Sequence, residues 1–268
     1  MDLSIIIVNY NTKDLTLACI DSILRSNPRV GYEIILIDNG STDGSAEYFD
    51  KIRGSKIRLI LHKKNLGFSK ANNSGIQKAL GRFILLLNSD TEVTRGSIDA
   101  LYDFALHTPG VGLVGPKLLN LDKSTQASVF RLPTLKRAIK QYWFGHKGIF
   151  DKYVPESQKP IEVEAIVAAV MLITPIARRK AGMLDERYFM YFEDLEFCRR
   201  VTKAGLKIYY LPSVEIYHHH GASSKNVESK DQWRRLIPSS KIYHGWIGHS
   251  LITFVIWISQ KLRKVKLS

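Results

Sequence analysis

The first 90 residues alternate between runs that suit buried strands and segments with helical spacing, which restricts the chain to a small set of folds. A continuous β-branched run at 3–8 predicts a strand buried on both faces, and the apolar runs at 33–37, 57–61 and 82–87 predict three further strands. Apolar residues at helical spacing lie between them, as in 15–24 and 69–80, and Thr12 is placed to cap the first helix. Strands that alternate with helices predict an α/β fold with a mostly parallel central sheet flanked by helices.

Each predicted strand ends in short polar residues, at 9–11, 38–41, 62–65 and 88–90. Ligands bind beyond the carboxyl ends of the strands in open parallel sheets, so the sequence predicts a ligand site at this edge. Neither G-x-G-x-x-G nor G-x-x-x-x-G-K-[ST] follows the first strand. Dehydrogenases and P-loop enzymes are therefore disfavoured, and a bound nucleotide would need a metal or basic side chains for its phosphates.

The chain is strongly basic, with 39 Lys and Arg against 25 Asp and Glu among 268 residues, a formal net charge of +14. Such a surface favours an anionic partner: nucleic acid, a phosphate-bearing substrate or an anionic membrane. No nucleic-acid-binding motif is present, so we expect no nucleic-acid partner. Two cysteines, Cys19 and Cys198, exclude a disulfide framework and a cysteine-based zinc site. Because a predicted strand begins at residue 3, we expect no signal peptide and a cytoplasmic location.

The second half of the chain is less regular. Residues 117–160 have no clear period and suggest a long acceptor-side segment. A buried strand is predicted at 164–174, a helix that begins with Pro175, a helix at 193–204, and strands at 207–211 and 214–220. These segments predict a single fused domain rather than two separable ones.

The C-terminal segment 246–258 is strongly apolar and is followed by Lys261, Arg263, Lys264 and Lys266. Its 13 residues are fewer than the roughly 20 that a bilayer span requires. An apolar, tryptophan-flanked helix that runs into a basic tail favours an in-plane anchor, with membrane contact through 242–266. A helix packed on the domain, with a solvated charged end, is the alternative.

Three groups of residues have the chemistry of a catalytic site. Asp90 follows an apolar strand and suits a Mg²⁺ or Mn²⁺ shared with substrate phosphates, or a simple turn cap. Glu193 and Asp194 follow an aromatic run that would limit water and favour a general base, although carboxylates also stabilise helix starts. His218 and His220 lie on one face of a predicted strand, where they suit metal or phosphate binding or plain solvent exposure.

Taken together, these segments resemble a known family. VNYN at 8–11, IDNGSTDGS at 37–45, NLGFSKANNSG at 65–75, LLLNSDTEV at 85–93, LDERYFMYFEDLEFCRR at 184–200 and HHHGASS at 218–224 occur in the order found in family-2 inverting glycosyltransferases of the GT-A fold. The chain is most similar to the rhamnosyltransferase-like branch. The resemblance implies a domain over 1–225, with a nucleotide-sugar-binding half (1–115) and an acceptor and catalytic half (116–225), followed by a helical segment at 226–268.

The resemblance also implies a donor site. It places the nucleotide base and ribose at Val8, Tyr10 and Asp38, and the rest of the nucleotide-sugar pocket at Asn65, Gly67, Asn73 and Ser89. Many relatives have an arginine where this chain has Asn72. One phosphate contact is therefore expected from another basic group.

The metal and the base follow in the same way. The D-x-D motif of the family falls on residues 88–90, where Asn88 replaces the first carboxylate, so the metal is expected on Asp90 with His218 or His220. The E-D pair falls on Glu193 and Asp194, which implies that Asp194 is the catalytic base.

The expected function is transfer of a sugar, rhamnose from dTDP-rhamnose or a hexose from a UDP-sugar, with inversion. The implied acceptor is a glycan or a polyprenyl-diphosphate-linked sugar in bacterial cell-surface polysaccharide synthesis, at the inner face of the plasma membrane. A nucleotidyltransferase would carry a Gly- and basic-rich loop at 9–13, which is absent. A non-catalytic basic binding protein is the other alternative.

Overall fold

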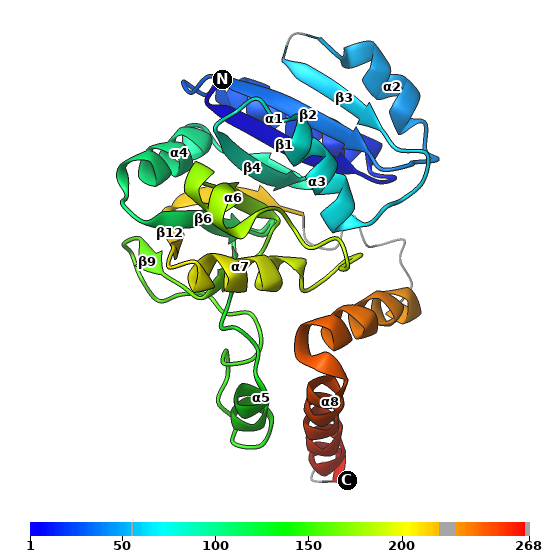
Figure 1. Ribbon diagram of the computed structural model, residues 1–268, viewed down its shortest axis with the longest axis vertical. Helices are drawn as coiled ribbons and strands as arrows, with labels where there is room; N and C mark the ends of the chain where they lie inside the picture. The colour runs from blue at the N-terminus through cyan, green and yellow to red at the C-terminus, as the bar shows by residue number, and fades with distance from the viewer. Residues whose placement is uncertain (55, 220–228, 266–268) are drawn as a thin grey trace.

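The computed structural model describes residues 1–54, 56–219 and 229–265 (Figure 1). A central sheet has the strand order β3-β2-β1-β4-β11-β6-β12-β5. Its strands are β1 (Leu3–Asn9), β2 (Tyr32–Asp38), β3 (Ile57–Leu61), β4 (Phe83–Asn88), β5 (Thr91–Val93), β6 (Val111–Leu119), β11 (Val170–Ile173) and β12 (Lys207–His218). The first four are mutually parallel, and β6 is parallel to β12, whereas β11 and β5 are antiparallel to their neighbours.

Helices cover both faces of this sheet, as the alternation predicts (Figure 1). One face packs against α3 (Phe68–Lys78), α6 (Pro175–Ala181) and α7 (Glu193–Lys203). The other packs against α1 (Lys13–Ser26), α2 (Ser45–Ile52) and α4 (Ser97–His107). Successive residues of β1 alternate between the two cores, with Ile6 in the first and Ile5 and Ile7 in the second. Both cysteines are buried and unpaired, as expected.

The predicted strand at 164–174 is two strands in different sheets. Residues Ala165–Ile166 form β10, which pairs with β8 (Val129–Phe130), and β11 begins at Val170. The chain between them leaves both ladders, where Val167 donates its N–H to Ser128 O and Ala169 O accepts from Asn88 N at 2.8 Å. A continuous apolar run does not reveal such a break, because most of its residues are buried on both sides of the break.

Two further differences are local. The strands predicted at 207–211 and 214–220 form one strand, β12, whose register against β6 shifts between Leu211 and Glu215, around Pro212. Thr12 occupies the N-cap position of α1, but its hydroxyl makes no capping hydrogen bond and instead donates to Asn9 Oδ1 at 3.0 Å. The short strands β7 (Thr125–Gln126) and β9 (Ile161–Glu162) extend the central sheet from β6 and β12.

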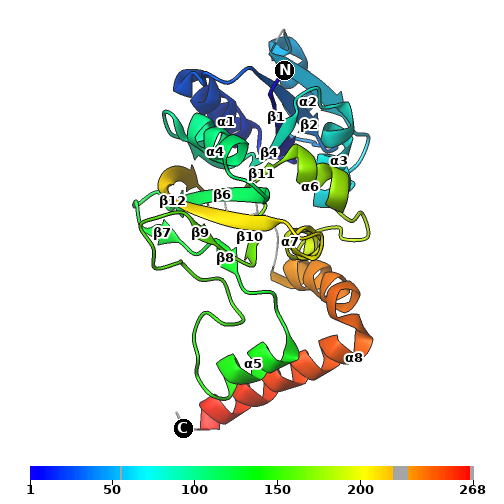
Figure 2. The same ribbon diagram turned by 60° about the vertical axis from the view of Figure 1, so that its left-hand side comes forward.

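The remaining helices, α5 (Leu135–Tyr142) and α8 (Ser229–Val265), meet at a distance from the sheet (Figures 1 and 2). Helix α8 is two helices joined at Gly245, whose φ of 73° breaks the helical path. Its second half packs on α5 through Ala138, Ile252 and Val255. We call α5 and this second half the α5–α8 unit. Among the described residues, no helix is both long and apolar enough to span a bilayer.

Candidate functional site

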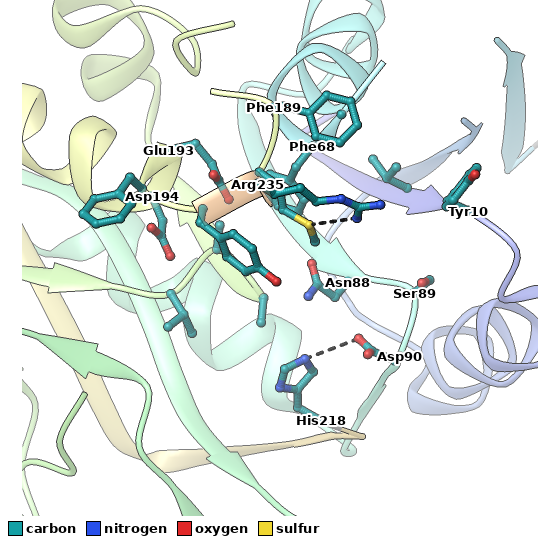
Figure 3. Close-up of a pocket in the computed structure, with 18 of the residues that line it drawn as sticks. Tyr10, Phe68, Asn88, Ser89, Asp90, Phe189, Glu193, Asp194, His218 and Arg235 are labelled. Atoms are coloured by element: carbon teal, nitrogen blue, oxygen red, sulfur yellow. Dashed lines mark hydrogen bonds and ion pairs between the residues drawn. The ribbon is translucent and has the colours of Figure 1, made fainter. Parts of the chain in front are cut away.

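A cavity of about 490 Å³ opens at the carboxyl ends of β1 and β4 (Figure 3). It is closed by the loop before α7, by the end of β12 and by the first half of α8. Nine of the residues predicted for the site line it: Val8, Tyr10, Asn65, Gly67, Ser89, Asp90, Glu193, Asp194 and His218. Motifs from both halves of the sequence therefore meet at the sheet edge where a ligand was expected.

Three of the residues predicted for the site are not among those that line the cavity. Asp38 is buried beside the cavity, and its two carboxylate oxygens accept from Asn9 Nδ2 at 2.7 Å and Ser41 N at 3.0 Å. Asn73 holds the chain before the aromatic loop, since its amide exchanges hydrogen bonds of 2.8 and 3.1 Å with the backbone of Leu184. His220 lies outside the described residues. A donor contact by Asp38 or Asn73 and a metal contact by His220 stay predictions.

Asp90 and His218 face each other across the base of the cavity (Figure 3). Asp90 Oδ1 lies 3.3 Å from His218 Nε2, and both side chains are largely buried. The amide of Asn88 also lines the cavity here. No three His, Cys, Asp or Glu side chains cluster as a complete metal site among the described residues. One carboxylate and one imidazole, with an amide beside them, fit a divalent cation that takes its other ligands from substrate phosphates and water.

Glu193 and Asp194 form the first turn of α7, where the helix dipole favours carboxylates. Burial raises the pKa of Asp194, although the N–H of Leu195, at 2.8 Å from its Oδ1, and the charge of Lys152 act in the opposite direction. Burial and the neighbouring Asp194 raise the pKa of Glu193 well above its ordinary value. In the described part of the chain, no hydrogen-bond partner reaches the buried Oε2 of Glu193. The pair thus offers a carboxyl with raised proton affinity beside an acid that favours its neutral form.

The backbone is strained directly before this pair. Tyr191 and Phe192 both have positive φ, 72° and 68°, an arrangement that non-glycine residues adopt at a cost. The same loop rests on α3, where Phe68 donates its N–H to Phe189 O at 2.7 Å. A Cβ on Gly67 would lie 2.5 Å from that carbonyl oxygen, so only glycine permits this contact. Gly67 therefore fixes the loop that positions the carboxyl pair.

Arg235 and Lys152 are cavity residues that sequence reasoning did not find. Arg235, from α8, extends into the cavity in the direction of Tyr10, with its guanidinium 5.6 Å from the ring of Phe189 (Figure 3). The missing arginine at Asn72 indicated that another basic group was needed. Nothing in the spacing pointed to a helix about 160 positions later, because only the folded chain brings α8 to the sheet edge.

Comparisons with known proteins identify one family of enzymes. A sequence profile described as "Glycosyl transferase family 2" matches residues 4–150. An N-acetylglucosaminyl-diphospho-decaprenol L-rhamnosyltransferase of Mycobacterium tuberculosis is 32% identical over 209 residues, which cover 71% of this chain and 67% of that protein. The dTDP-rhamnosyl transferase RfbF of Shigella flexneri is 22% identical over 226 residues, 83% of this chain and 70% of that protein.

Solved structures show the same fold at low identity. GalNAc-T7 with UDP, GalNAc and Mn²⁺ superposes with a TM-score of 0.63 at 16% identity, covering 81% of this chain and 44% of that one. S. aureus TarS 1–349 with UDP-GlcNAc gives a TM-score of 0.61 at 16% identity, covering 91% and 66%. The predicted GT-A fold is confirmed.

Proposed function

Because the chain belongs to glycosyl transferase family 2, we propose that it moves a sugar from a nucleotide donor to a lipid-linked acceptor with inversion at the anomeric carbon. The observation that supports this proposal most is that one cavity is lined both by the predicted donor residues and by a carboxyl pair suited to proton transfer. Rhamnose from dTDP-rhamnose is the first candidate donor, supported by the names of the two relatives, and UDP-hexoses are the second.

The donor end of the cavity would be bounded by Val8, near the end of β1, and by Tyr10, which follows that strand. We assign the donor diphosphate to the space between Tyr10 and Asp90, into which Arg235 extends (Figure 3). Arg235 would supply the positive charge that Asn72 lacks, and a guanidinium can pair with two phosphate oxygens at once. Asp90 and His218 would hold a Mg²⁺ or Mn²⁺ ion, which stabilises negative charge on the leaving diphosphate.

Asp194 would act as the general base. The acceptor hydroxyl forms a bond to the anomeric carbon as the bond from that carbon to the diphosphate oxygen breaks, and the hydroxyl proton passes to the Asp194 carboxylate. Its raised pKa suits this role, because a stronger base takes the proton more readily. Glu193, buried beside it, would donate a hydrogen bond from its neutral form to a sugar oxygen.

The α5–α8 unit would hold the enzyme at a membrane. One side of the second half of α8 packs on α5. The opposite side exposes an apolar stripe, which consists of Trp246, Ile247, Leu251, Phe254, Trp257 and Leu262. Residues 131–150 contain five Lys or Arg and 232–268 contain seven, and neither segment has an Asp or Glu. An apolar stripe within an acid-free basic region suits peripheral binding to anionic lipid at the cytoplasmic face.

The test is a transfer assay with dTDP-rhamnose, UDP-hexoses and GDP-mannose against prenyl-diphosphate-linked N-acetylglucosamine, with and without Mn²⁺. We expect one nucleotide sugar to be consumed and the anomeric configuration of the product, read by NMR, to be opposite to that of the donor. Retained configuration would overturn the single displacement. Release of pyrophosphate from a nucleoside triphosphate would favour the nucleotidyltransferase alternative, and absence of any turnover the non-catalytic one.

A further inference from the structure

Lys152 is the basic residue that lines the cavity on the Asp194 side. We propose that Lys152 binds the diphosphate of a lipid-linked acceptor, between the sugar at Asp194 and the prenyl chain at the α5–α8 unit. The inference rests on the proposed function and adds to it a second phosphate site, separate from that of the donor.

The backbone fixes the position of Lys152. Its neighbour Tyr153 pairs with Val129 through two backbone hydrogen bonds, of 2.9 and 3.3 Å, beside the start of β8. The Lys152 ammonium lies 5.8 Å from the ring of Phe130, another cavity residue. No carboxylate of the described chain lies within ion-pair distance of its ammonium, although its charge acts on Asp194, so the ammonium can still pair with a ligand.

Lys152 is also close in sequence to the membrane-facing part of the molecule. Phe150, two residues earlier, packs against the cluster that joins α5 to α8. Gln141 of α5 ties this turn down, since its buried Oε1 accepts from the N–H of Phe150 at 2.8 Å and of Ile149 at 3.1 Å. A short, anchored connection therefore leads from the α5–α8 unit to the cavity.

The order of these groups matches the order of groups in the acceptor. A prenyl-diphosphate sugar carries its hydroxyl at one end, its two phosphates next and its hydrocarbon chain at the other end. The protein presents Asp194, then Lys152, then the exposed stripe of the α5–α8 unit. A flexible lysine suits a diphosphate that approaches from a bilayer, because its ammonium can follow the phosphates without a fixed geometry.

The site is also distinct from that of the donor phosphates. Those are assigned to the part of the cavity bounded by Asp90, His218 and Arg235, toward Tyr10 (Figure 3). Lys152 instead acts electrostatically on Asp194. Removal of Lys152 should therefore affect the acceptor and leave the affinity for the free nucleotide unchanged.

The test compares Lys152→Ala and Lys152→Arg with Lys159→Ala, a nearby exposed lysine outside the cavity, as the matched control. KM is measured for farnesyl-diphosphate-linked N-acetylglucosamine and for octyl N-acetylglucosaminide, which has the sugar but no phosphate. Calorimetry with dTDP and with farnesyl diphosphate supplies binding constants that need no turnover.

Lys152→Ala should raise the KM of the diphosphate-linked acceptor about 10-fold or more, the usual effect of losing a charged hydrogen bond. It should weaken the binding of farnesyl diphosphate by a similar factor. Lys152→Arg should restore most of both, and the KM of the octyl acceptor and the affinity for dTDP should be unchanged in each variant. Equal losses with both acceptors, or a loss of dTDP affinity, would overturn the proposal. If the wild-type protein transfers no sugar yet binds farnesyl diphosphate through Lys152, the proposed function fails and this site stands.

Discussion

Nδ1 of His218 lies 2.7 Å from Oε1 of Gln126, while Nε2 of the same ring lies 3.3 Å from Asp90 Oδ1. The amide of Gln126 is fixed in this orientation, because its Nε2 donates to Asn120 Oδ1 at 2.8 Å. His218 must therefore donate from Nδ1. Its Nε2 is left facing a carboxylate, as a ligand for a shared cation or as a protonated partner of Asp90.

We expect Gln126→Leu to weaken Mn²⁺ binding by about 10–100-fold, the usual effect of losing the group that orients a ligating histidine. Gln126→Glu should retain the affinity, since a carboxylate also accepts from Nδ1. The measurement is a Mn²⁺ titration followed by electron paramagnetic resonance, in the presence of dTDP. Equal affinity of all three proteins would show that His218 does not ligate the ion.

Asp194 should destabilise the protein at neutral and alkaline pH. Burial raises its pKa in the folded state, so folding favours the protonated form, and the resulting stability is lost as pH rises from about 3.8 through the raised value. Asp194→Asn removes this loss. At pH 8 its melting temperature should exceed that of the wild type by about 2–4 °C for each kcal/mol of stability that the ionised Asp194 costs. The difference should shrink toward pH 4. A constant difference would contradict the raised pKa.

Gly67→Ala should displace the loop that carries Phe189. The added Cβ would lie 2.5 Å from Phe189 O and 2.7 Å from its ring, in a backbone of φ +86°. Gly110→Ala is the matched control, since Gly110 has φ +74° and open space at the same position. Both variants should lose stability from the positive φ, Gly67→Ala by more because ψ 174° places Gly67 in a region that essentially only glycine adopts. Only Gly67→Ala should also lose dTDP affinity in a thermal-shift titration. If Gly67→Ala and Gly110→Ala bind dTDP with the same affinity, the loop contact is dispensable for donor binding.

Phe254→Ser should reduce binding to vesicles that contain anionic lipid. The ring is half exposed within the apolar stripe, and burying such a side chain contributes about 1.5–3 kcal/mol. Leu24→Ser, on the exposed side of α1, is the control and should leave vesicle binding unchanged. Sedimentation with vesicles at rising salt measures both the apolar and the electrostatic contribution to binding. If the wild-type protein is a dimer in solution and Phe254→Ser makes it monomeric, the stripe is instead a contact between two copies of the chain.

Sequence patterns predicted β1 to β4 because each of these strands is a short apolar run that ends in polar residues. They also predicted Asp90, His218, Glu193 and Asp194 as cavity residues. They failed where the signal depends on distant partners. The break at Ala168 is hidden inside an apolar run, and Arg235 and Lys152 belong to segments whose approach to the cavity depends on how α8 and α5 pack.

The most direct test of the account is the transfer rate of Asp194→Asn, measured beside its affinity for dTDP and the pH profile of the wild type. Loss of the base should lower kcat by about 10²–10⁴-fold while dTDP still binds. The wild-type kcat/KM should rise with pH through a pKa above the ordinary aspartate value of 3.8. An Asp194→Asn variant that transfers the sugar at the wild-type rate would contradict the assignment of Asp194 as the base.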